Sequence, residues 1–428
     1  MRDFAEKSEC TNHLRDFDPF DIHRDDPFTT FKEARRSCPI FYSHRIGAWC
    51  VTRYHDIVLV LTNRSDFSVR EHNPRPTAHL TERTKQVMAA WRGKDALPLG
   101  SLDPPEHDGV RTSVGTVFSP EAVASLEPQI RSLARDLLPR LNTAGDSELL
   151  TAFCLPYALA VILTALGIEG EDPQRFHTWT EQRVRLMTAP AGTDADELEL
   201  CAEGLLEYGR FADELVARRL AEPGDDAISR LLAGNFRANP MTAAQVRAHI
   251  PTLITAGYRT AAEALATTVD LAARDPRRWR TLVSGEVPPA ALVKEALRYD
   301  CPITGMYRTA LTDTTVGNTL VRAGDRVLLL YGSGNRDESV FEEPDNVLPG
   351  RPHSPPHLGF GRGTHYCVGA ALAGLELRVA LEELIAAYPT LQLVPGKGDQ
   401  TYQPVFPFRA RNALWVRTRG GAHGDAHR

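Results

Sequence analysis

The sequence predicts a mainly α-helical domain with a small β-rich portion. Most segments between residues 105 and 388 repeat apolar side chains at helical spacing, and strand-like alternation is confined to a few short stretches. A chain of 428 residues could hold two or three domains, but neither a repeat nor a low-complexity linker divides it. We therefore expect one folded domain over residues 18–418, a flexible leader over 1–17 and a disordered tail over 419–428.

The first elements are indicated by local composition. DPFTTFKEARRSC predicts a short helix, PIFYSHRIGAWCVTRY predicts two strands that turn at Gly47, and HDIVLVLTNRSDF predicts a further helix. Residues 69–99 are rich in proline, histidine and charge, which predicts a long loop with at most short helical pieces. Loops of that length inside compact domains are often functional.

Helical spacing dominates the rest of the chain, with breaks at Pro223-Gly224 and Asp275-Pro276. A helix of unusual length is expected over about 243–273. The segment TTVGNTLVRAGDRVLLLY interrupts this pattern and predicts strands around turns at Gly317-Asn318 and 323–325. The segment FRARNALWVRT predicts one last strand.

Composition excludes several classes of protein. Hydrophobic residues make up 42% and charged residues 24% of the chain, and the net charge is -6, so no basic stripe suggests a nucleic-acid partner. The seven cysteines are odd in number and widely spaced, which argues against a disulfide framework or a zinc ribbon. The N-terminus lacks the apolar core of a signal peptide, and the longest apolar run, LPYALAVILTALGI, is shorter than a membrane span. We expect a soluble cytoplasmic protein, without a membrane partner.

One cysteine stands in an unusual setting, in GFGRGTHYCVG directly before a predicted helix. The first N–H groups of a helix lack intrahelical partners, so they favour the thiolate of Cys367 as a metal ligand. The alternative is an inert buried cysteine, which is the commoner case. Gly361 and Gly363 would let the backbone approach a flat ligand, Gly369 would do the same at the start of the helix, and Phe360 could cover the sulfur.

The pattern Phe-Gly-x-Gly-x-His-x-Cys-x-Gly followed by a helix resembles that of the cytochrome P-450 family of haem-thiolate monooxygenases. The resemblance extends over about residues 18–418. It implies a helix-rich, triangular domain that binds haem b, with Cys367 as the axial ligand of the iron, where a thiolate favours O–O cleavage.

A second motif supports the resemblance. Glu295 and Arg298 form a Glu-x-x-Arg on one helix face, which alone would indicate an exposed pair worth about 0 to 1 kcal/mol. In the family this pair is buried beneath the haem loop and bonds to a downstream arginine. Arg351 would supply that arginine here, although Val347 stands where the family often has phenylalanine.

The resemblance also assigns residues to the haem propionates. His107 and Arg111 stand four apart on a predicted helix and can reach one pair of carboxylates. Arg308, His357 and His365 occupy further positions that face the propionates in related enzymes. Taken singly, each has the alternative of an ordinary surface or loop residue.

The long helix contains ITAGYRTAAEAL, where the family pattern is Ala-Gly-x-Asp/Glu-Thr. Ala256, Gly257 and Thr260 match, and the Thr260 hydroxyl could bond a preceding carbonyl to open a groove for oxygen. The acidic position, however, is Arg259, a departure that puts ordinary proton delivery in doubt. Two interpretations stay open: Arg259 pairs with Glu263 and points away from the haem, or it faces the groove and binds a substrate carboxylate.

The function that the resemblance implies is oxidation of a small organic molecule, through hydroxylation, dealkylation, epoxidation or oxidative coupling. A bacterial natural-product intermediate is the expected substrate, by analogy. The pocket should be built from the loop after Val69, the helix face 255–260, and four further side chains: Ile303, Thr304, Met306 and Phe406.

Electrons are expected from a separate ferredoxin and ferredoxin reductase, because no Gly-x-Gly-x-x-Gly fingerprint for a flavin or nicotinamide follows a strand. Arg111 and Arg362 could steer an acidic ferredoxin to a monomeric enzyme. Two alternatives remain: a peroxide-driven peroxygenase that acts on a carboxylate substrate through Arg259, and a haem protein that binds ligands without turnover.

Overall fold

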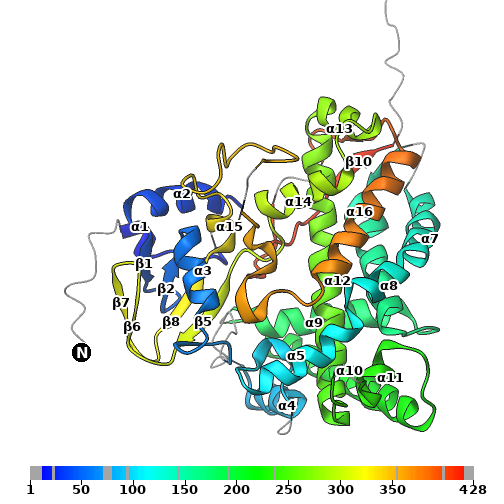
Figure 1. The fold of residues 1–428 in the computed structure, drawn as a ribbon, viewed down its shortest axis with the longest axis horizontal. Coiled ribbons are helices and arrows are strands. Elements are labelled where there is room, and N and C mark those ends of the chain that lie inside the picture. Colours follow the sequence, from blue (N-terminus) through cyan, green and yellow to red (C-terminus); the bar gives the residue numbers. More distant parts are fainter. Residues whose placement is uncertain are drawn as a thin grey trace, which may run out of the picture.

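The computed structural model describes most of the chain, namely residues 12–21, 25–70, 80–92, 96–141, 145–190, 192–235, 238–352, 355–397 and 401–418. A β-rich part lies on one side of the molecule and a larger helical part on the other (Figure 1). The described helices are α1 (Asn12–Arg15), α2 (Pro27–Ser37), α3 (Tyr54–Thr62), α4 (Glu82–Arg92), α5 (Glu106–Val117), α6 (Pro120–Ser125), α7 (Glu127–Leu137), α8 (Leu155–Leu166), α9 (Pro173–Thr188), α10 (Ala195–Ala221), α11 (Ala227–Ala233), α12 (Ala243–Ala273), α13 (Pro276–Val283), α14 (Pro289–Tyr299), α15 (Tyr331–Gly334) and α16 (Ala370–Ala387).

The largest sheet has five short strands in the order β1-β2-β8-β5-β3. The described strands are β1 (Ile40–Ser43), β2 (Ala48–Val51), β3 (Phe67–Ser68), β4 (Asp146–Glu148), β5 (Met306–Ala310), β6 (Thr314–Val316), β7 (Thr319–Val321), β8 (Arg326–Leu329), β9 (Gln392–Leu393) and β10 (Trp415–Arg417). Strands β1 and β2 form the expected hairpin, and Gly47 takes the positive φ of 61° that its turn requires. Strand β2 then pairs in parallel with β8, which joins the N-terminal segment to a strand nearly 300 positions later.

Helix α12 is the central element of the helical part (Figure 1). It spans the 31 residues that the sequence predicted, and it begins with a capping box in which Thr242 and Gln245 bond each other's backbone. Helices α8, α10, α14 and α16 all pack against it. Because it is enclosed on so many sides, most of its side chains are buried regardless of polarity.

Two predictions about local structure were wrong. The segment 69–99 holds α4, an 11-residue helix, whose Met88 is buried against α10 residues such as Leu205. The sequence of this segment is polar and flanked by prolines, so it did not predict a helix. The helix is stabilised by packing against α10, a contact that is distant in sequence. The leader predicted over 1–17 overlaps the folded core, because Leu14 and Phe17 are fully buried against Phe31 and Phe41.

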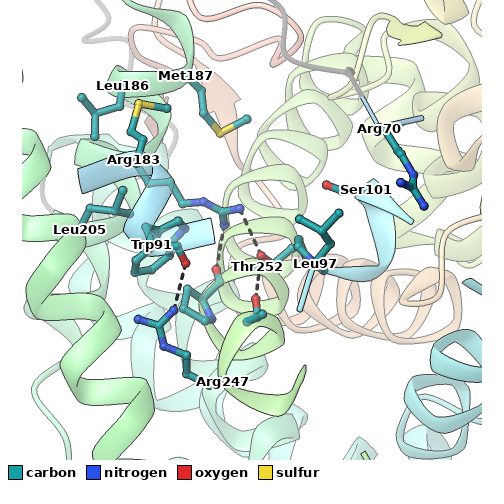
Figure 2. Close-up of a pocket in the computed structure, with 14 residues that line it drawn as sticks. Arg70, Trp91, Leu97, Ser101, Arg183, Leu186, Met187, Leu205, Arg247 and Thr252 are labelled. Carbon is teal, nitrogen blue, oxygen red and sulfur yellow. Dashed lines mark hydrogen bonds between the residues drawn. The ribbon is translucent and has the colours of Figure 1, made fainter. Parts of the chain in front are cut away.

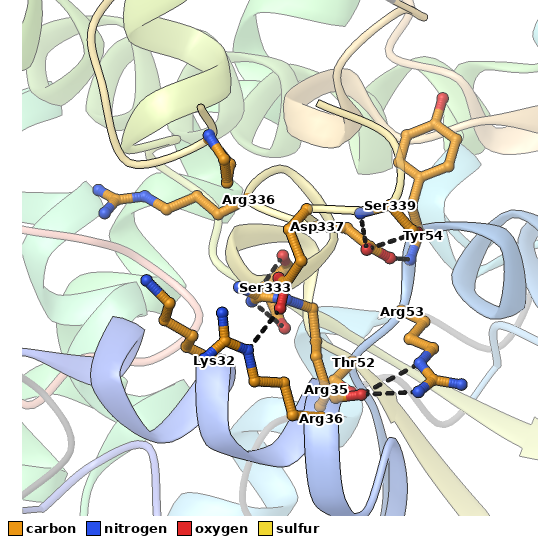
Figure 3. Close-up of polar contacts among 12 residues, drawn as sticks. Lys32, Arg35, Arg36, Thr52, Arg53, Tyr54, Ser333, Arg336, Asp337 and Ser339 are labelled. Carbon is orange, nitrogen blue, oxygen red and sulfur yellow. Dashed lines mark hydrogen bonds and ion pairs between the residues drawn. The ribbon is translucent and has the colours of Figure 1, made fainter. Parts of the chain in front are cut away.

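The β-rich part is tied to the chain that leads into the cysteine segment (Figure 3). The buried Arg35 of α2 donates to the carbonyl and hydroxyl oxygens of Ser333 and pairs with Glu338 at 3.0 Å. The Asp337 carboxylate accepts the backbone N–H of Tyr54 at the start of α3. These bonds fix α15 and the residues that follow it against α2 and α3.

Two further observations concern the cysteines and membrane spans. Cys38 is disulfide-bonded, whereas Cys50, Cys154, Cys201, Cys301 and Cys367 are free. A single disulfide does not make the fold depend on a network of disulfides. The spacing of the cysteines could not reveal this one bond. Across the described ranges, no helix combines the length and the apolar composition needed to cross a bilayer.

Gly257 provides a test of how α12 packs on α8. A Cβ at this position would stand 2.8 Å from Cδ1 and 2.9 Å from Cγ1 of Ile162, although alanine is the better helix former by about 1 kcal/mol. We expect Gly257→Ala to lower the free energy of unfolding by about 1 to 2 kcal/mol through overpacking, measured by denaturant titration. Addition of Ile162→Val should recover most of the loss. As a control, Gly374→Ala in α16, where a Cβ meets nothing within 4 Å, should not destabilise.

Candidate functional site

The cysteine segment is a compact loop between two 3-10 turns and α16. The turns are Leu358–Phe360 and Gly363–His365. The Cys367 N–H donates to the carbonyl oxygen of Phe360 at 2.9 Å, which closes the loop. Gly369, at the N-cap of α16, has its backbone N–H near the sulfur, where it lowers the pKa of the thiol. The loop thus places the sulfur beside the first turn of α16.

Gly363 is required for a reason that the sequence did not indicate. Its φ is 66°, and a Cβ there would collide with the backbone carbonyl of Leu61 in α3. The expected reason was close approach of a flat ligand. The structure shows instead that Gly363 lets the cysteine loop lie directly against α3.

The protein alone does not favour the thiolate of Cys367. Burial raises the pKa of the thiol, and the Gly369 N–H and the Arg111 charge oppose this without overcoming it. The sequence predicted that the N–H groups at the start of the helix would favour the thiolate. This prediction did not include the burial of the sulfur, which has the larger effect on the pKa. A bound metal ion would supply the missing positive charge, since a coordinating thiol is deprotonated by its metal.

Four cationic or potentially cationic side chains gather beside the loop. The rings of His107 and His365 lie 4.3 Å apart, and Arg111 and Arg308 contribute to the electrostatic environment of His365. Arg111 also donates to the carbonyl oxygen of Tyr366 at 2.6 Å. Burial, followed by the charges of His107 and Arg308, lowers the pKa of His365 to about 3.

This arrangement fits haem. The buried Nε2 of His107 has no hydrogen-bond partner among the described residues, so a donor or acceptor is available where an acidic group would lie. Two propionates would neutralise the surrounding cations, and Cys367 would hold the iron. Haem bound in this way would supply the chemistry of dioxygen activation.

His357 does not join this cluster in the structure. Its Nδ1 accepts the N–H of Gly359 at 3.1 Å, and its ring lies 5.4 Å from that of Phe360. Its charged neighbours are Arg362 of the cysteine loop, Lys294 of α14, and the Glu-x-x-Arg pair itself. A role toward a propionate therefore stays a prediction for this residue.

The Glu-x-x-Arg pair is buried and connected. Arg298 donates to both carboxylate oxygens of Glu295 at 2.8 and 2.9 Å, and Arg351 donates to the same carboxylate at 2.9 Å. The Leu348 N–H is a further donor. Although burial alone would raise it, the pKa of Glu295 lies below its ordinary value because of these bonds, those of Arg298 above all. The structure brings all three predicted residues together.

An opening interrupts the otherwise buried surface of α12 at the predicted groove. Ala256 is exposed and Gly257 and Thr260 are half-buried, between stretches that are buried on both sides. The Thr260 hydroxyl donates to the Ala256 carbonyl at 2.6 Å. The nearby Thr255 hydroxyl is buried and has no partner among the described residues. The helix thus presents small residues and the Thr260 hydroxyl where a bound molecule could approach.

Arg259 pairs with Glu263, as the first of the two interpretations predicted, but its side chain is buried rather than on the surface of the helix. It forms the expected ion pair with Glu263, at 3.5 Å, yet it is only 3% exposed. Its main partners come from elsewhere: Glu181 of α9 at 2.5 Å and the side-chain oxygen of Gln403 at 2.9 Å. Sequence could not reveal these, because they lie 78 and 144 positions away.

The cluster around Arg259 therefore contains two carboxylates with different surroundings. Glu181 is 34% exposed, whereas Glu263 is 1% exposed, and burial raises the pKa of Glu263 to about 7 against the opposing charge of Arg259. Glu263 also accepts the backbone N–H of Arg411. Arg259 occupies the position where the family pattern has an acid, but the acidic side chain of Glu263 lies directly beside it.

The predicted pocket residues Ile303, Thr304, Met306 and Phe406 lie together but do not line the cavity shown in Figure 2. Thr304 bonds the Pro407 carbonyl, Ile303 pairs with Phe408, and Phe406 packs against Phe20. Strand β5 begins at Met306. That cavity lies between α4, α9, α10 and the N-terminal half of α12 (Figure 2).

The sequence missed most of the residues that line this cavity. Those on α12 precede the expected face 255–260, and α9 was assigned no role. Amphipathic spacing on α9 could have indicated its buried face, but not what that face contacts. The lining residues are Arg70, Met88, Trp91, Leu97, Pro98, Ser101, Arg183, Leu186, Met187, Leu205, Arg247, Ala248, Pro251 and Thr252.

Removing the carboxylate of Glu295 tests the buried network. Glu295→Gln leaves Arg298 and Arg351 without their shared charge partner, so we expect a loss of about 3 to 5 kcal/mol in unfolding free energy and poor haem retention. Because folding lowers the pKa of Glu295, its contribution is present at neutral pH and is lost as the pH falls below about 4. Haem content at pH 7 and denaturant titrations between pH 7 and about pH 3 measure both effects.

Asp313→Asn is the matched control, since its 2.7 Å pair with Arg322 is exposed on both sides. It should leave the stability close to that of the unchanged protein. A stable, haem-loaded Glu295→Gln protein would contradict the assignment of a supporting role to the network.

The contact between α9 and α12 is tested by Glu181→Gln. Arg259 would keep its bond to the neutral Gln403 and the longer ion pair with Glu263, so we expect a loss of about 1 to 2 kcal/mol, less than for a fully buried pair because Glu181 is partly exposed. Glu203→Gln, which removes an exposed pair with Arg83, should have an effect within about 0.5 kcal/mol. Equal effects of the two changes in thermal or denaturant unfolding would show that Arg259 does not depend on Glu181.

Comparisons with known proteins agree with this geometry. The family model for cytochrome P450 matches residues 290–404, which hold the Glu-x-x-Arg motif and the cysteine loop. Nocardicin C N-oxygenase of Nocardia uniformis subsp. tsuyamanensis is 34% identical over 81% of this chain and 83% of the relative. Erythromycin C-12 hydroxylase of Saccharopolyspora erythraea is 31% identical over 82% of this chain and 84% of the relative.

Solved structures confirm the predicted fold. Cytochrome P450 CREJ in complex with (4-ethylphenyl) dihydrogen phosphate superimposes with a TM-score of 0.84 at 28% identity, covering 94% of this chain and 99% of that one. P450BioI in complex with an acyl carrier protein ligated to hexadec-9Z-enoic acid gives a TM-score of 0.83 at 26% identity, covering 93% and 100%. With the cysteine loop, the cation cluster and the groove in place, the chain belongs to the cytochrome P450 family and is a haem b-dependent monooxygenase.

Proposed function

We propose that this monooxygenase oxidises a bacterial natural-product intermediate with dioxygen and with electrons from a separate ferredoxin and its reductase. Two relatives support the substrate class, since one is named as an N-oxygenase of nocardicin C and the other as a C-12 hydroxylase of erythromycin. The identity of the substrate and the reaction subtype depend on the cavity rather than on the fold.

The observation that carries the proposal is the opening at Ala256, Gly257 and Thr260. The Thr260 hydroxyl is fixed by the Ala256 carbonyl, so its oxygen can accept a hydrogen bond in the groove. This is the residue that the family pattern places beside bound oxygen. Its presence favours dioxygen-dependent chemistry over a purely peroxide-driven reaction.

Proton supply would reach Thr260 from the carboxylates around Arg259. Arg259 stays protonated and cannot relay a proton at neutral pH. Glu263 stands three positions after Thr260, on a neighbouring part of the helix surface, and its pKa of about 7 suits proton exchange. Glu181, which is partly exposed, connects the same cluster to solvent.

The electron donor would dock at the outer side of the cysteine loop. Arg111 and Arg362 bond the backbone carbonyls of Tyr366 and Pro356, and the Tyr366 side chain is exposed four residues after Arg362. Two arginines beside an exposed aromatic ring suit an acidic ferredoxin.

The peroxygenase alternative requires a substrate carboxylate on Arg259. Glu181 and Gln403 already bond this guanidinium, so a substrate would have to displace a charged partner. We therefore rank partner-driven oxidation above it. The alternative of ligand binding without turnover is disfavoured by the relatives, which are named as oxygenases and hydroxylases.

A reconstitution experiment tests the proposal. Compounds that shift the Soret band of the haem-loaded protein are incubated with a plant-type ferredoxin, its reductase, NADPH and ¹⁸O₂. We expect a product that carries one labelled oxygen atom only when all components are present. Cys367→Ser should abolish both the product and the long-wavelength Soret band of the ferrous carbon monoxide complex. Equal or faster turnover with hydrogen peroxide alone would support the peroxygenase instead.

A further inference from the structure

His249 of α12 is a buried histidine that has no part in the haem site or in the proposed proton supply. Its side chain is 1% exposed, and both ring nitrogens have backbone partners. Nδ1 lies 2.6 Å from the carbonyl oxygen of Gln245, one turn earlier on the same helix. Nε2 lies 3.0 Å from the backbone nitrogen of Leu99. The ring therefore joins α12 to a segment that lies 150 positions earlier in the sequence.

These two partners assign the tautomer of the ring. A carbonyl oxygen only accepts, so Nδ1 carries the proton and donates to Gln245. A backbone N–H only donates, so Nε2 is unprotonated and accepts from Leu99. A second proton would turn Nε2 into a donor that faces another donor. The buried N–H of Leu99 would then lose its partner, and the ring would gain a buried charge. The bond to Leu99 exists only while His249 is neutral.

The segment that His249 holds continues directly into α5. It begins with a 3-10 turn over Leu99–Ser101. Leu99 and Leu102 pack in the same apolar cluster as Ile250 of α12. Apolar packing keeps the segment near α12 but is not directional. The hydrogen bond from Leu99 to His249 therefore fixes the orientation of the segment.

Asp103 fixes the other end of this segment. Its carboxylate accepts the Ser68 hydroxyl at 2.5 Å and the Val69 N–H at 3.0 Å, which ties it to β3. Its backbone carbonyl accepts the N–H of His107 at 3.1 Å, in the first turn of α5. Displacement of the segment would therefore displace the start of α5. His107 and Arg111 both lie in that half of the helix.

The far half of α5 has an attachment of its own. The Ser113 hydroxyl donates to the Asn239 carbonyl at 3.0 Å. Loss of the bond at His249 would thus act on the first turn of α5 rather than on the whole helix. His107 lies in this turn, with its ring 4.3 Å from that of His365 in the cysteine loop.

We propose that neutral His249 is a positioning residue for the haem site. Through Leu99 and Asp103 it holds the first turn of α5, and with it His107, against the cysteine loop, and it releases this turn when its ring is protonated. The proposal concerns neither the substrate nor the electron donor, so it goes beyond the proposed function. It requires only that the protein binds haem.

The charged groups around His249 leave its titration to burial. Arg183 of α9 bonds Pro251, and Arg247 of α12 pairs at 3.0 Å with Asp213 of α10. Residues 97–102 include no titratable side chain. Among the described residues, no charged side chain alters the pKa of His249.

The pH dependence of the bond follows from this environment. Burial lowers the pKa of His249, and its bond to the Gln245 carbonyl opposes this without overcoming it. A histidine that is released into water has a pKa of about 6.5. Because the held state has the lower pKa, the bond is at full strength above about pH 6.5 and weakens as the pH falls below it.

Amide hydrogen exchange of the haem-loaded protein tests the bond. We expect the protection of a peptide that covers residues 97–103 to fall by up to about tenfold between pH 7.5 and pH 5.5, after correction for the intrinsic exchange rate. His249→Gln should remove this pH dependence and keep the protection, because its amide oxygen can accept the Leu99 N–H and does not titrate. His249→Leu should lose the protection at both pH values.

The rate of haem transfer to apomyoglobin measures the consequence for the haem site. At pH 7.5 we expect His249→Leu to lose haem about two- to tenfold faster than the unchanged protein, and His249→Gln to match the unchanged protein. On lowering the pH to 5.5, haem loss should accelerate more in the unchanged protein than in His249→Gln. His55→Gln, which replaces an exposed histidine of α3, is the matched control and should leave both measurements as they are in the unchanged protein.

The comparison of the unchanged protein with His249→Gln decides the proposal even if His249→Leu fails to fold. Equal pH dependence of protection in these two proteins, or haem loss that does not follow the protection, would overturn it. Neither measurement uses a substrate or an electron donor. Failure of turnover in the reconstituted system would therefore contradict the proposed function alone, and failure here would contradict this inference alone.

Discussion

The carboxylate of Glu295 is the constraint on which the cysteine loop depends. It accepts hydrogen bonds from Arg298 and Arg351, and Arg298 in turn donates to the backbone carbonyl of Asn335. The side chain of Asn335 accepts the N–H of Leu358 at 2.6 Å, and Leu358 begins the turn that leads to the cysteine. One buried charge thus connects three separate segments to the turn that leads into the cysteine loop.

The opposite side of the haem site depends on a different arrangement of charge. The family places an acid before the threonine of the long helix, whereas this chain has Arg259 there and supplies the acids from Glu181 and Glu263. Because Arg259 is buried, it needs those partners to offset its loss of solvation. The consequence is a polar cluster that keeps carboxylates close to Thr260 without one at the usual position.

Much of the fold was predictable from the sequence because its signals are local. The long helix has a capping residue and sustained spacing, and the strands around Gly47 and Gly317 have turn residues at each end. The cysteine motif and Glu295 were also found, since both are defined by short spacing. Helix α4 was missed because its stability comes from packing on α10, a contact that no local pattern records.

The residues of the site could be predicted only where they belong to a short motif with characteristic spacing. Gly363 was selected correctly but for an incomplete reason, because its neighbour Leu61 is some 300 positions away. The partners of Arg259 and the position of Arg183 both follow from how α9 crosses α12, which is a tertiary property.

Helix α9 is joined to α12 by polar contacts along its length: His177 with Tyr258, Glu181 with Arg259, and Arg183 with Pro251 and Thr252. Since α9 forms one wall of the cavity, any movement that widens the cavity at this wall stretches these contacts. Separating Glu181 from Arg259 would leave the arginine with less compensation and draw water toward the groove. If this cavity admits the substrate, its opening would also loosen the polar contacts of Arg259, and a ligand that holds α9 in place would keep them intact.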